Sequence, residues 1–325
     1  MSEEDGLISA YRLDGNGGGE RITSWDALSG SRGQGVLWVH IDHSTEAARD
    51  WLREASGLRP LIQEALLADE TRPRCLAVDE GVLLNLRGVN LNPGSDPEDM
   101  VAIRLWLEKD LVISARHRRL MAVEDLRQAL VKGHGPQDSG ALAMMLAERL
   151  TARMDPVLDG LQDQLDALED TIITALSREL RSELSELRRQ TIMLRRYIAP
   201  QREALRRLAV EEVDWLTQRR RDRLMEVSDR VTRYMEDLDV IRDRASVIND
   251  ELANRLAERM DRTMYLLSLV TLVFLPLTVI SGMLGMNVGG IPGGNIPWAF
   301  AVTCLLFAGI AGFEIWLLRR LRWWL

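Results

Sequence analysis

The sequence predicts an α+β membrane protein with an N-terminal α/β domain, long coiled-coil stalk helices and two C-terminal membrane-spanning helices. Three observations lead to this prediction. No charged residue occurs from Thr263 to Phe313, although 28% of the chain is charged. Between residues 154 and 252, apolar residues recur in steps of three and four, which is typical of coiled coils. Before about residue 135, short apolar runs alternate with helical patterns.

The first region, residues 1–135, has the pattern of an α/β domain. Runs rich in Val, Ile, Leu and Trp indicate strands at 7–13, 36–41, 82–90, 101–107 and 111–115. Helical periodicity indicates helices at 44–55, 59–68 and 120–131. We expect Ser44 to cap the first of these helices, and glycine- and asparagine-rich clusters at 15–19 and 92–96 to form turns.

The second region, residues 136–262, is predicted to form a helical stalk. One apolar seam runs through Met154, Leu158, Leu161, Leu165, Leu168 and Ile172, and continues through Leu180, Leu184 and Leu187. A second seam runs through Leu224, Val227, Val231, Tyr234, Leu238, Ile241, Ala245, Ile248 and Leu252. We expect Pro200 to break or kink the chain between the seams. Since no helix breaker separates Leu252 from Met264, the second helix is expected to enter the membrane without interruption.

The third region, residues 263–325, contains two predicted spans. Residues 264–284 and 298–318 each hold 21 residues, or about 31 Å of helix, which is enough to cross a bilayer core. The glycine-rich segment 285–297 connects them and carries no Lys or Arg, whereas arginines precede the first span and follow the second. The positive-inside rule therefore predicts a multi-pass protein with both termini in the cytoplasm and the loop outside.

The composition narrows the function further. A formal net charge of −8 gives no electrostatic footprint for nucleic acid, so no nucleic-acid partner is expected. The first six residues are acidic and do not resemble a cleavable signal sequence. Cys75 and Cys304 are the only cysteines, one in the soluble part and one in a span, so no disulfide framework is expected.

Carboxylates recur every seven residues along the second seam helix. These residues are Asp222, Asp229, Glu236, Asp243 and Asp250, which we call the acidic ladder. The same count continues through Ala257, Met264, Thr271, Thr278 and Gly285 in the predicted span. If several copies surround an axis with this face inward, the carboxylates form rings that attract cations. The alternative is an ordinary solvated face, with Asp229 paired to Arg233 one turn later.

The segment TLVFLPLTVISGMLGMN (residues 271–287) resembles the signature of the CorA superfamily of divalent metal-ion transporters, in which Gly-Met-Asn ends the first of two terminal spans. The following VGGIPGG (residues 288–294) lacks an acidic residue and resembles the ZntB branch, which is associated with zinc. The predicted architecture of the whole chain resembles that of this superfamily, but specific sequence motifs are shared only over residues 264–294.

This resemblance implies a funnel-shaped homopentamer in the inner membrane that transports zinc or another divalent cation and holds no tight cofactor. It implies that Gly285, Met286 and Asn287 form the external pore mouth. The predicted pore-lining residues, four from the resemblance and Thr271 from the ladder face, are Met264, Leu267, Thr271, Leu275 and Thr278. The resemblance also places Asp250 at a regulatory or metal-binding position, with Asp243 and Glu236 as further cation-attracting groups.

The residue types of this pathway favour transport of a largely hydrated ion. Asn, Thr, Leu and Met offer no thiolate or imidazole to a dehydrated zinc ion. We therefore expect recognition through water at Asn287 and low selectivity among divalent cations. The apolar positions would gate by dewetting, unless they pack between helices.

Several functions remain open at this point. Glu314 is the one carboxyl within the two spans, and we expect it to pair with a nearby arginine, so the residues alone do not decide between a proton-coupled carrier and a channel. Zinc efflux, a passive magnesium or cobalt channel and a membrane-anchored scaffold without transport are the alternatives. An enzyme is not expected, because no phosphate-binding loop or nucleophile arrangement occurs in residues 1–135. His40 and His43 are expected on opposite faces of a strand, and Cys75 as a buried small side chain.

Overall fold

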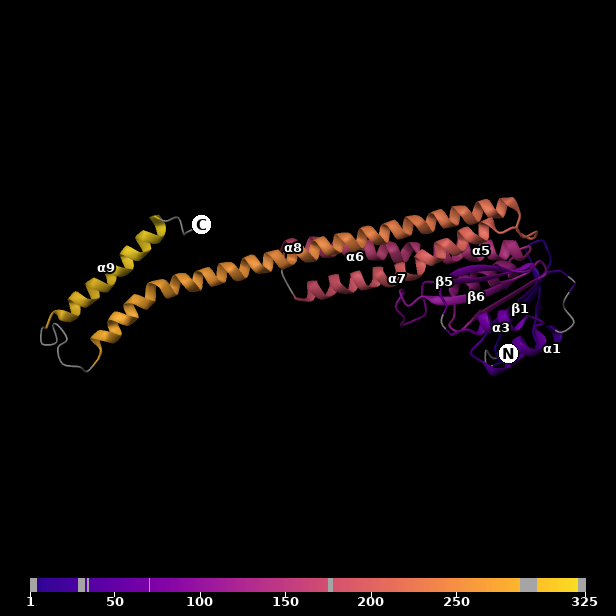
Figure 1. Cartoon of the computed structure of the whole chain (residues 1–325), viewed down its shortest axis with the longest axis horizontal. Coiled ribbons are helices and arrows are strands. Elements are labelled where there is room, and N and C mark those ends of the chain that lie inside the picture. The colour runs from indigo at the N-terminus through magenta and orange to yellow at the C-terminus, as the bar shows by residue number, and fades with distance from the viewer. Residues whose placement is uncertain are drawn as a thin grey trace. The chain divides into compact units, whose positions relative to one another are not determined.

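The structure, a computed structural model, describes residues 5–28, 33, 35–69, 71–174, 178–286 and 297–320, with the backbone alone at 172–174 and 178. The chain divides into two compact units, Met1–Asn249 and Asp250–Leu325. Figure 1 shows the elements of each unit. The predicted fold class of an α/β unit, long helices and two apolar C-terminal helices is confirmed.

A seven-stranded mixed sheet forms the centre of the first unit, in the order β2-β1-β3-β7-β6-β5-β4. Of these pairings, β3 with β7 is parallel and the others are antiparallel. The strands are β1 (Leu7–Leu13), β2 (Gly19–Ile22), β3 (Leu37–Asp42), β4 (Arg74–Val78), β5 (Gly81–Gly88), β6 (Val101–Leu107) and β7 (Leu111–Arg116).

Short helices cover one face of the sheet (Figure 1). They are α1 (Trp25–Leu28), α2 (Glu46–Asp50), the π-helical turn η2 (Trp51–Ala55) and α3 (Pro60–Leu67). Leu37, Val39 and Ile41 of β3 alternate toward this face and share a core with Leu52 and Ile62. This alternation is the period-two pattern that a half-buried strand requires.

Longer helices lie over the opposite face (Figure 1). Of these, α5 (Ser139–Ala152) and α7 (Arg178–Val210) pack against the sheet, while α4 (Met121–Val131) packs against α5 and α6 (Asp155–Thr174) packs against α7. Gly88 of β5 explains how closely α5 approaches, because a Cβ at this position would lie 2.7 Å from Leu150. Helix α7 packs against β4 and β5. At this contact, Gln201 accepts a hydrogen bond from the Arg87 backbone N at 2.7 Å, and the Arg87 guanidinium lies 4.0 Å from the Tyr197 ring centre.

Most predicted elements agree with the structure, with differences at their ends. Thr45, not Ser44, caps α2 by accepting a hydrogen bond from the Ala48 backbone N. The Ser44 hydroxyl instead donates to Asp42 at 2.6 Å. The strands β2 and β4 and helix α1 were not predicted, because β2 and β4 are edge strands with mostly exposed side chains.

Both seams of the stalk are confirmed. All nine residues of the second seam are buried, as are the described residues of the first; the side chain of Ile172 lies outside the described residues. Pro200 lies inside α7 and does not end it, so a break at this position is wrong, whereas a kink stays a prediction. Helix α8 (Gln218–Leu284) continues over 67 residues, as predicted.

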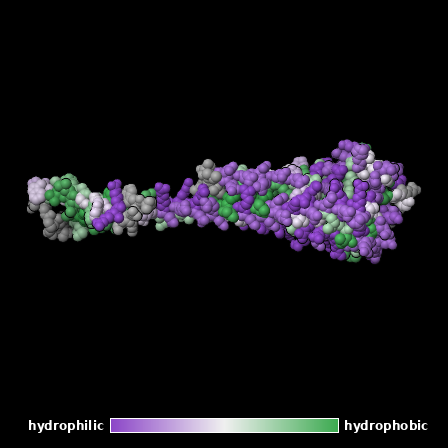
Figure 2. All heavy atoms as spheres, turned by 90° about the horizontal axis from the view of Figure 1, so that it is seen from above, coloured by the Kyte–Doolittle hydropathy of each residue, from purple (hydrophilic) through white to green (hydrophobic). Residues whose placement is uncertain are grey.

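The second unit contains the C-terminal part of α8 and α9 (Ala299–Arg320). Both helices are long and apolar enough to cross a membrane. Figure 2 shows hydrophobic side chains at the surface of this unit, whereas hydrophilic side chains predominate on the first. Pro276 lies within α8 without ending it.

Candidate functional site

The predicted pore mouth is partly described. Gly285 closes the last turn of α8, its backbone N donating to the Ser281 carbonyl at 2.9 Å, and Met286 is exposed. Asn287 lies outside the described residues, as does most of the loop that follows. Its role at the mouth therefore stays a prediction.

The five predicted pore-lining residues are all uncovered by their own chain. Met264, Leu267 and Leu275 are 63%, 67% and 60% exposed. Thr271 and Thr278 are exposed as well, and each donates its hydroxyl proton to the carbonyl four residues earlier, at 2.9 and 2.7 Å. The hydroxyl oxygens then act as acceptors. Such a face offers weak oxygen acceptors and apolar surface, which suits a hydrated cation better than a dehydrated one.

The acidic ladder is exposed along its whole length, but its members differ in their surroundings. Asp222 accepts a hydrogen bond from the Gln218 side chain at 2.8 Å. In the described part of the chain, Asp229 forms no ion pair with Arg233, so that pair is not formed, and the choice between a solvated face and a cation-facing one stays open.

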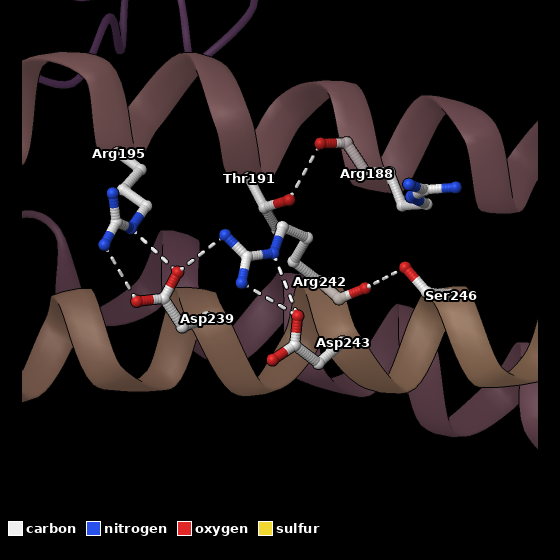
Figure 3. Close-up of polar contacts among 7 residues, drawn as sticks. All are labelled: Arg188, Thr191, Arg195, Asp239, Arg242, Asp243 and Ser246. Atoms are coloured by element: carbon white, nitrogen blue, oxygen red, sulfur yellow. Dashed lines mark hydrogen bonds and ion pairs between the residues drawn. The ribbon is translucent and has the colours of Figure 1, made fainter.

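Asp243 belongs to a row of four charged side chains that contact one another in sequence (Figure 3). The Arg195 guanidinium of α7 contacts both carboxylate oxygens of Asp239 on α8, at 2.7 and 3.0 Å. Arg242 lies 3.0 Å from Asp239 and 2.8 Å from Asp243. We call Arg195, Asp239, Arg242 and Asp243 the stalk charge chain. The hydrogen bond with Asp243, and then the charges of Asp243 and Asp239, raise the pKa of Arg242.

Two hydroxyl groups beside the stalk charge chain donate to backbone carbonyls and not to its carboxylates. Thr191 donates to the Arg188 carbonyl at 2.8 Å, and Ser246 donates to the Arg242 carbonyl at 3.0 Å. The Arg188 guanidinium is directed away from the carboxylates in Figure 3. Arg242 and Arg195 are therefore the cations that balance these two aspartates.

Within one chain, the described residues contain no group of three His, Cys, Asp or Glu side chains that could hold a metal ion. Glu236, Asp243 and Asp250 lie seven residues apart on α8, or about 10.5 Å along a helix. They cannot share one ion. The predicted cation site at each ladder position thus requires carboxylates from other copies and remains a prediction.

His40 and His43 lie on opposite faces of the sheet, as expected. The His40 ring nitrogen Nδ1 lies 2.8 Å from the Ser114 hydroxyl, and His43 Nε2 lies 2.9 Å from the Arg104 guanidinium. Burial lowers the pKa of both rings, that of His43 to about 4. The pair therefore forms no joint zinc site. The centres of the His43 and His117 rings lie 6.1 Å apart, which no spacing in the sequence indicates.

Cys75 is buried on β4, and burial raises the pKa of its thiol to about 12. The thiolate, which is the form that binds metals and attacks electrophiles, is thus disfavoured. Cys75 acts as a small apolar residue, as expected.

Glu314 lies in a pocket of about 670 Å³ within the second unit. Leu272 of α8 and apolar residues of α9 line this pocket. The carboxyl oxygen Oε2 is buried and has no hydrogen-bond partner among the described residues. No pairing with an arginine is formed among the described residues, but Arg322 lies outside them, so the expected pairing stays a prediction. A carboxyl inside a membrane span is a functional candidate, because such groups are costly to bury.

Comparison with known proteins agrees with this architecture. Residues 33–320 match the family model described as CorA-like Mg2+ transporter protein. The divalent cation transporter CmaX of Pseudomonas aeruginosa is 43% identical over 99% of this chain and 98% of its own. The zinc transport protein ZntB of Pectobacterium carotovorum is 35% identical over 99% and 97%.

Solved structures agree as well. The structure of full-length CmaX matches with a TM-score of 0.86 at 42% identity and covers 99% of this chain and 100% of its own. The CorA magnesium transporter of Methanocaldococcus jannaschii matches with a TM-score of 0.82 at 16% identity, over 96% and 97%; this likeness concerns the fold. The chain belongs to the CorA-like family and is a divalent cation transporter of the CorA and ZntB type.

Proposed function

We propose that this chain forms a homopentamer in the inner membrane and takes up zinc through a central pore lined by the first span of each copy. The proposed division is a cytoplasmic α/β domain at 1–135, a helical stalk at 136–262 and the membrane part at 263–325, with both termini in the cytoplasm. Some transport of other divalent cations is part of the proposal. The name of the ZntB relative supports zinc as the physiological ion.

The observation that supports this function best is the uncovered face of α8. The second seam is buried up to Leu252, whereas no residue from 253 to 284 is buried by its own chain. A helix that exposes Met264, Thr271 and Thr278, and that carries an exposed acidic ladder with the same seven-residue spacing, is suited to surround an axis with its copies. Rings of carboxylates would then concentrate cations in front of an uncharged passage.

The proposed pore mouth can be tested with Asn287→Ala. Zinc flux into proteoliposomes holding the purified full chain should fall at least about tenfold, because five side-chain amides that hydrogen-bond the hydrated ion are lost at once. Asn295→Ala in the same loop is the matched control and should leave flux unchanged. Wild-type flux in the Asn287 variant would refute the assignment of the mouth. Absence of divalent flux from the wild type under every gradient would favour the scaffold.

We further propose that uptake is coupled to protons through Glu314. It is the one carboxyl in residues 263–318, and its oxygen Oε2 is buried without a partner among the described residues. Glu314→Gln should abolish the stimulation of zinc uptake by an inward proton gradient and preserve downhill flux. Glu314→Asp should retain part of the stimulation. If the proton gradient stimulates zinc uptake equally in the Glu314→Gln variant and in the wild type, a passive channel is the better description.

A passive magnesium or cobalt channel is the second candidate. The uncovered face of α8 offers oxygen acceptors and apolar side chains but no imidazole or thiolate, and magnesium retains its waters readily. Flux of magnesium that exceeds that of zinc at equal concentration, without dependence on a proton gradient, would favour this candidate. Zinc efflux would appear as faster flux in the opposite orientation.

A further inference from the structure

The first span contains a backbone acceptor to which its own helix supplies no amide donor. Pro276 lies inside α8 and has no amide proton, so the Leu272 carbonyl lacks the donor that an α-helix provides four residues later. Thr271 and Thr278 do not replace this donor, because each donates its hydroxyl proton to the carbonyl four residues before it. Since the bilayer core offers no water, a freed carbonyl in a span is usually satisfied by a group on a neighbouring helix.

Glu314 of α9 lies in the same pocket as Leu272. Both residues line the pocket of about 670 Å³, and the other lining residues in the described part of the chain are leucine, isoleucine, phenylalanine and glycine. Glu314 Oε2 is buried and has no hydrogen-bond partner among the described residues. Thr303, a hydroxyl group on the same helix, donates to the Ala299 carbonyl at 3.0 Å. An acceptor without a helical donor and a carboxyl without a partner therefore occur at one pocket.

The charge state of Glu314 decides whether these two groups can bond. A protonated carboxyl is a donor, whereas a carboxylate can only accept, as a carbonyl does. No other charged residue lines the pocket in the described structure. On the two helices, the described charged residues closest to it in sequence lie outside the apolar spans, at Asp261, Arg262, Arg319 and Arg320.

We propose that protonated Glu314 donates a hydrogen bond to the Leu272 carbonyl, and that the transported proton thereby joins α9 to the first span beside Pro276. This inference rests on the proposed function, in which Glu314 carries the coupled proton. A proton from the outer side binds the carboxylate, and the neutral acid donates to the carbonyl. When the proton leaves toward the cytosol, two acceptors face each other and the bond is lost. Pro276 is then a positioning residue, because it keeps the carbonyl available.

Infrared spectroscopy of the full chain in nanodiscs tests this bond. The C=O stretching band of protonated Glu314 is identified as the band that Glu314→Gln removes. Pro276→Ala returns an amide donor to the Leu272 carbonyl, so the carboxyl loses its acceptor and its band should move to higher frequency. Gly312→Ala on α9 is the matched control. A Cβ at this position has no atom within 4 Å, and Gly312 does not line the pocket, so the band should stay in place.

A second variant separates the freed carbonyl from the bend that a proline produces. Pro276→Ala combined with Leu277→Pro keeps a proline in the span but frees the Val273 carbonyl, which lies about 100° further round the helix. The Glu314 band of this double variant should lie at the position found in Pro276→Ala. A band at the wild-type position would mean that the bend alone matters, and would overturn the inference.

Transport provides the functional measurement. In proteoliposomes, Pro276→Ala should reduce the stimulation of zinc uptake by an inward proton gradient about two- to tenfold, the factor that one hydrogen bond contributes. In the Glu314→Gln background, Pro276→Ala should have no further effect on this stimulation, because the two groups act as a pair.

Three results would overturn the inference or separate it from the proposed function. An unmoved Glu314 band in Pro276→Ala, with normal proton-stimulated uptake in the wild type, would remove the inference alone. A wild type without a Glu314 carboxyl band at any pH would also overturn it, and appearance of the band in Arg322→Gln would identify that arginine as the partner. A band that moves as expected, without proton stimulation of wild-type uptake, would support the bond and refute the proposed coupling.

Discussion

The part of helix α8 up to Leu252 and the apolar part from residue 253 differ in how far their own chain covers them. From Arg223 to Leu252, one side of the helix is buried and ion pairs connect its flanks to other helices, such as Arg223 with Glu148 and Arg244 with Asp166. From 253 to 284, no residue is buried. Covered apolar residues stabilise the fold of a single chain, whereas uncovered ones serve contact with lipid, other copies or ions.

The largest effect expected from this comparison follows removal of a covered leucine. Leu238 is fully buried, so Leu238→Ala should lower the free energy of unfolding of the first unit by about 2 to 5 kcal/mol, through lost burial and the cavity left behind. Leu267→Ala, at 67% exposure, is the matched control and should leave that unfolding nearly unchanged. Chemical denaturation of the full chain in detergent, followed by circular dichroism, measures both. Equal losses in the two variants would contradict the comparison.

Acidification should also lower the stability of the first unit. Burial lowers the pKa of His43 to about 4, from 6.5. The unfolded chain therefore binds more protons than the folded chain between these values. Stability is full above pH 6.5 and falls as the pH drops from 6.5 toward 4, by up to about 3 kcal/mol for this ring.

His43→Gln should flatten that pH dependence, because glutamine retains an acceptor for Arg104 and does not titrate. Unfolding curves at pH 7.5 and pH 5 measure the difference. Burial also lowers the pKa of His40, so this ring contributes in the same direction. It should account for the pH dependence of stability that remains in the His43 variant. An unchanged slope in the His43 variant would show that this ring is hydrated in the folded protein.

The smallest effect is expected at an uncovered charge. Arg233 is exposed and forms no ion pair with Asp229 in the described structure, so Arg233→Ala should change the free energy of unfolding by less than about 0.5 kcal/mol. The same denaturation experiment tests this. A loss above 1 kcal/mol would mean that Arg233 has a partner in the assembled protein, and crosslinking between copies would then identify the interface.

Elements with a strong internal pattern could be predicted from the sequence. The strands β1 and β6 have the predicted bounds, and the second seam is buried at every predicted position. Edge strands were missed, because a strand paired on one side and exposed to solvent shows little hydrophobic alternation. The cap of α2 was displaced by one residue, since Ser44 and Thr45 are equally good caps by residue type.

The candidate site was predictable only in part. The ladder follows from spacing along one helix, and the relation of Arg242 to Asp239 is an i,i+3 pair that the sequence also contains. Arg195 is 44 residues from Asp239, so no local pattern connects them. The same holds for His43 with Arg104, which come from different parts of the sheet.

The sequence by itself determined the two apolar spans, the Gly-Met-Asn ending of the first and the alternation of seam and ladder on one helix, because these depend on composition and on the helical period. The tertiary structure decided which charged side chains pair with one another, which histidine rings are buried away from water, and that the Glu314 oxygen Oε2 has no hydrogen-bond donor among the described residues. Those outcomes depend on contacts between side chains from segments that are far apart in the sequence. The free-energy cost of burying a polar group depends on whether such a contact supplies a hydrogen-bond partner.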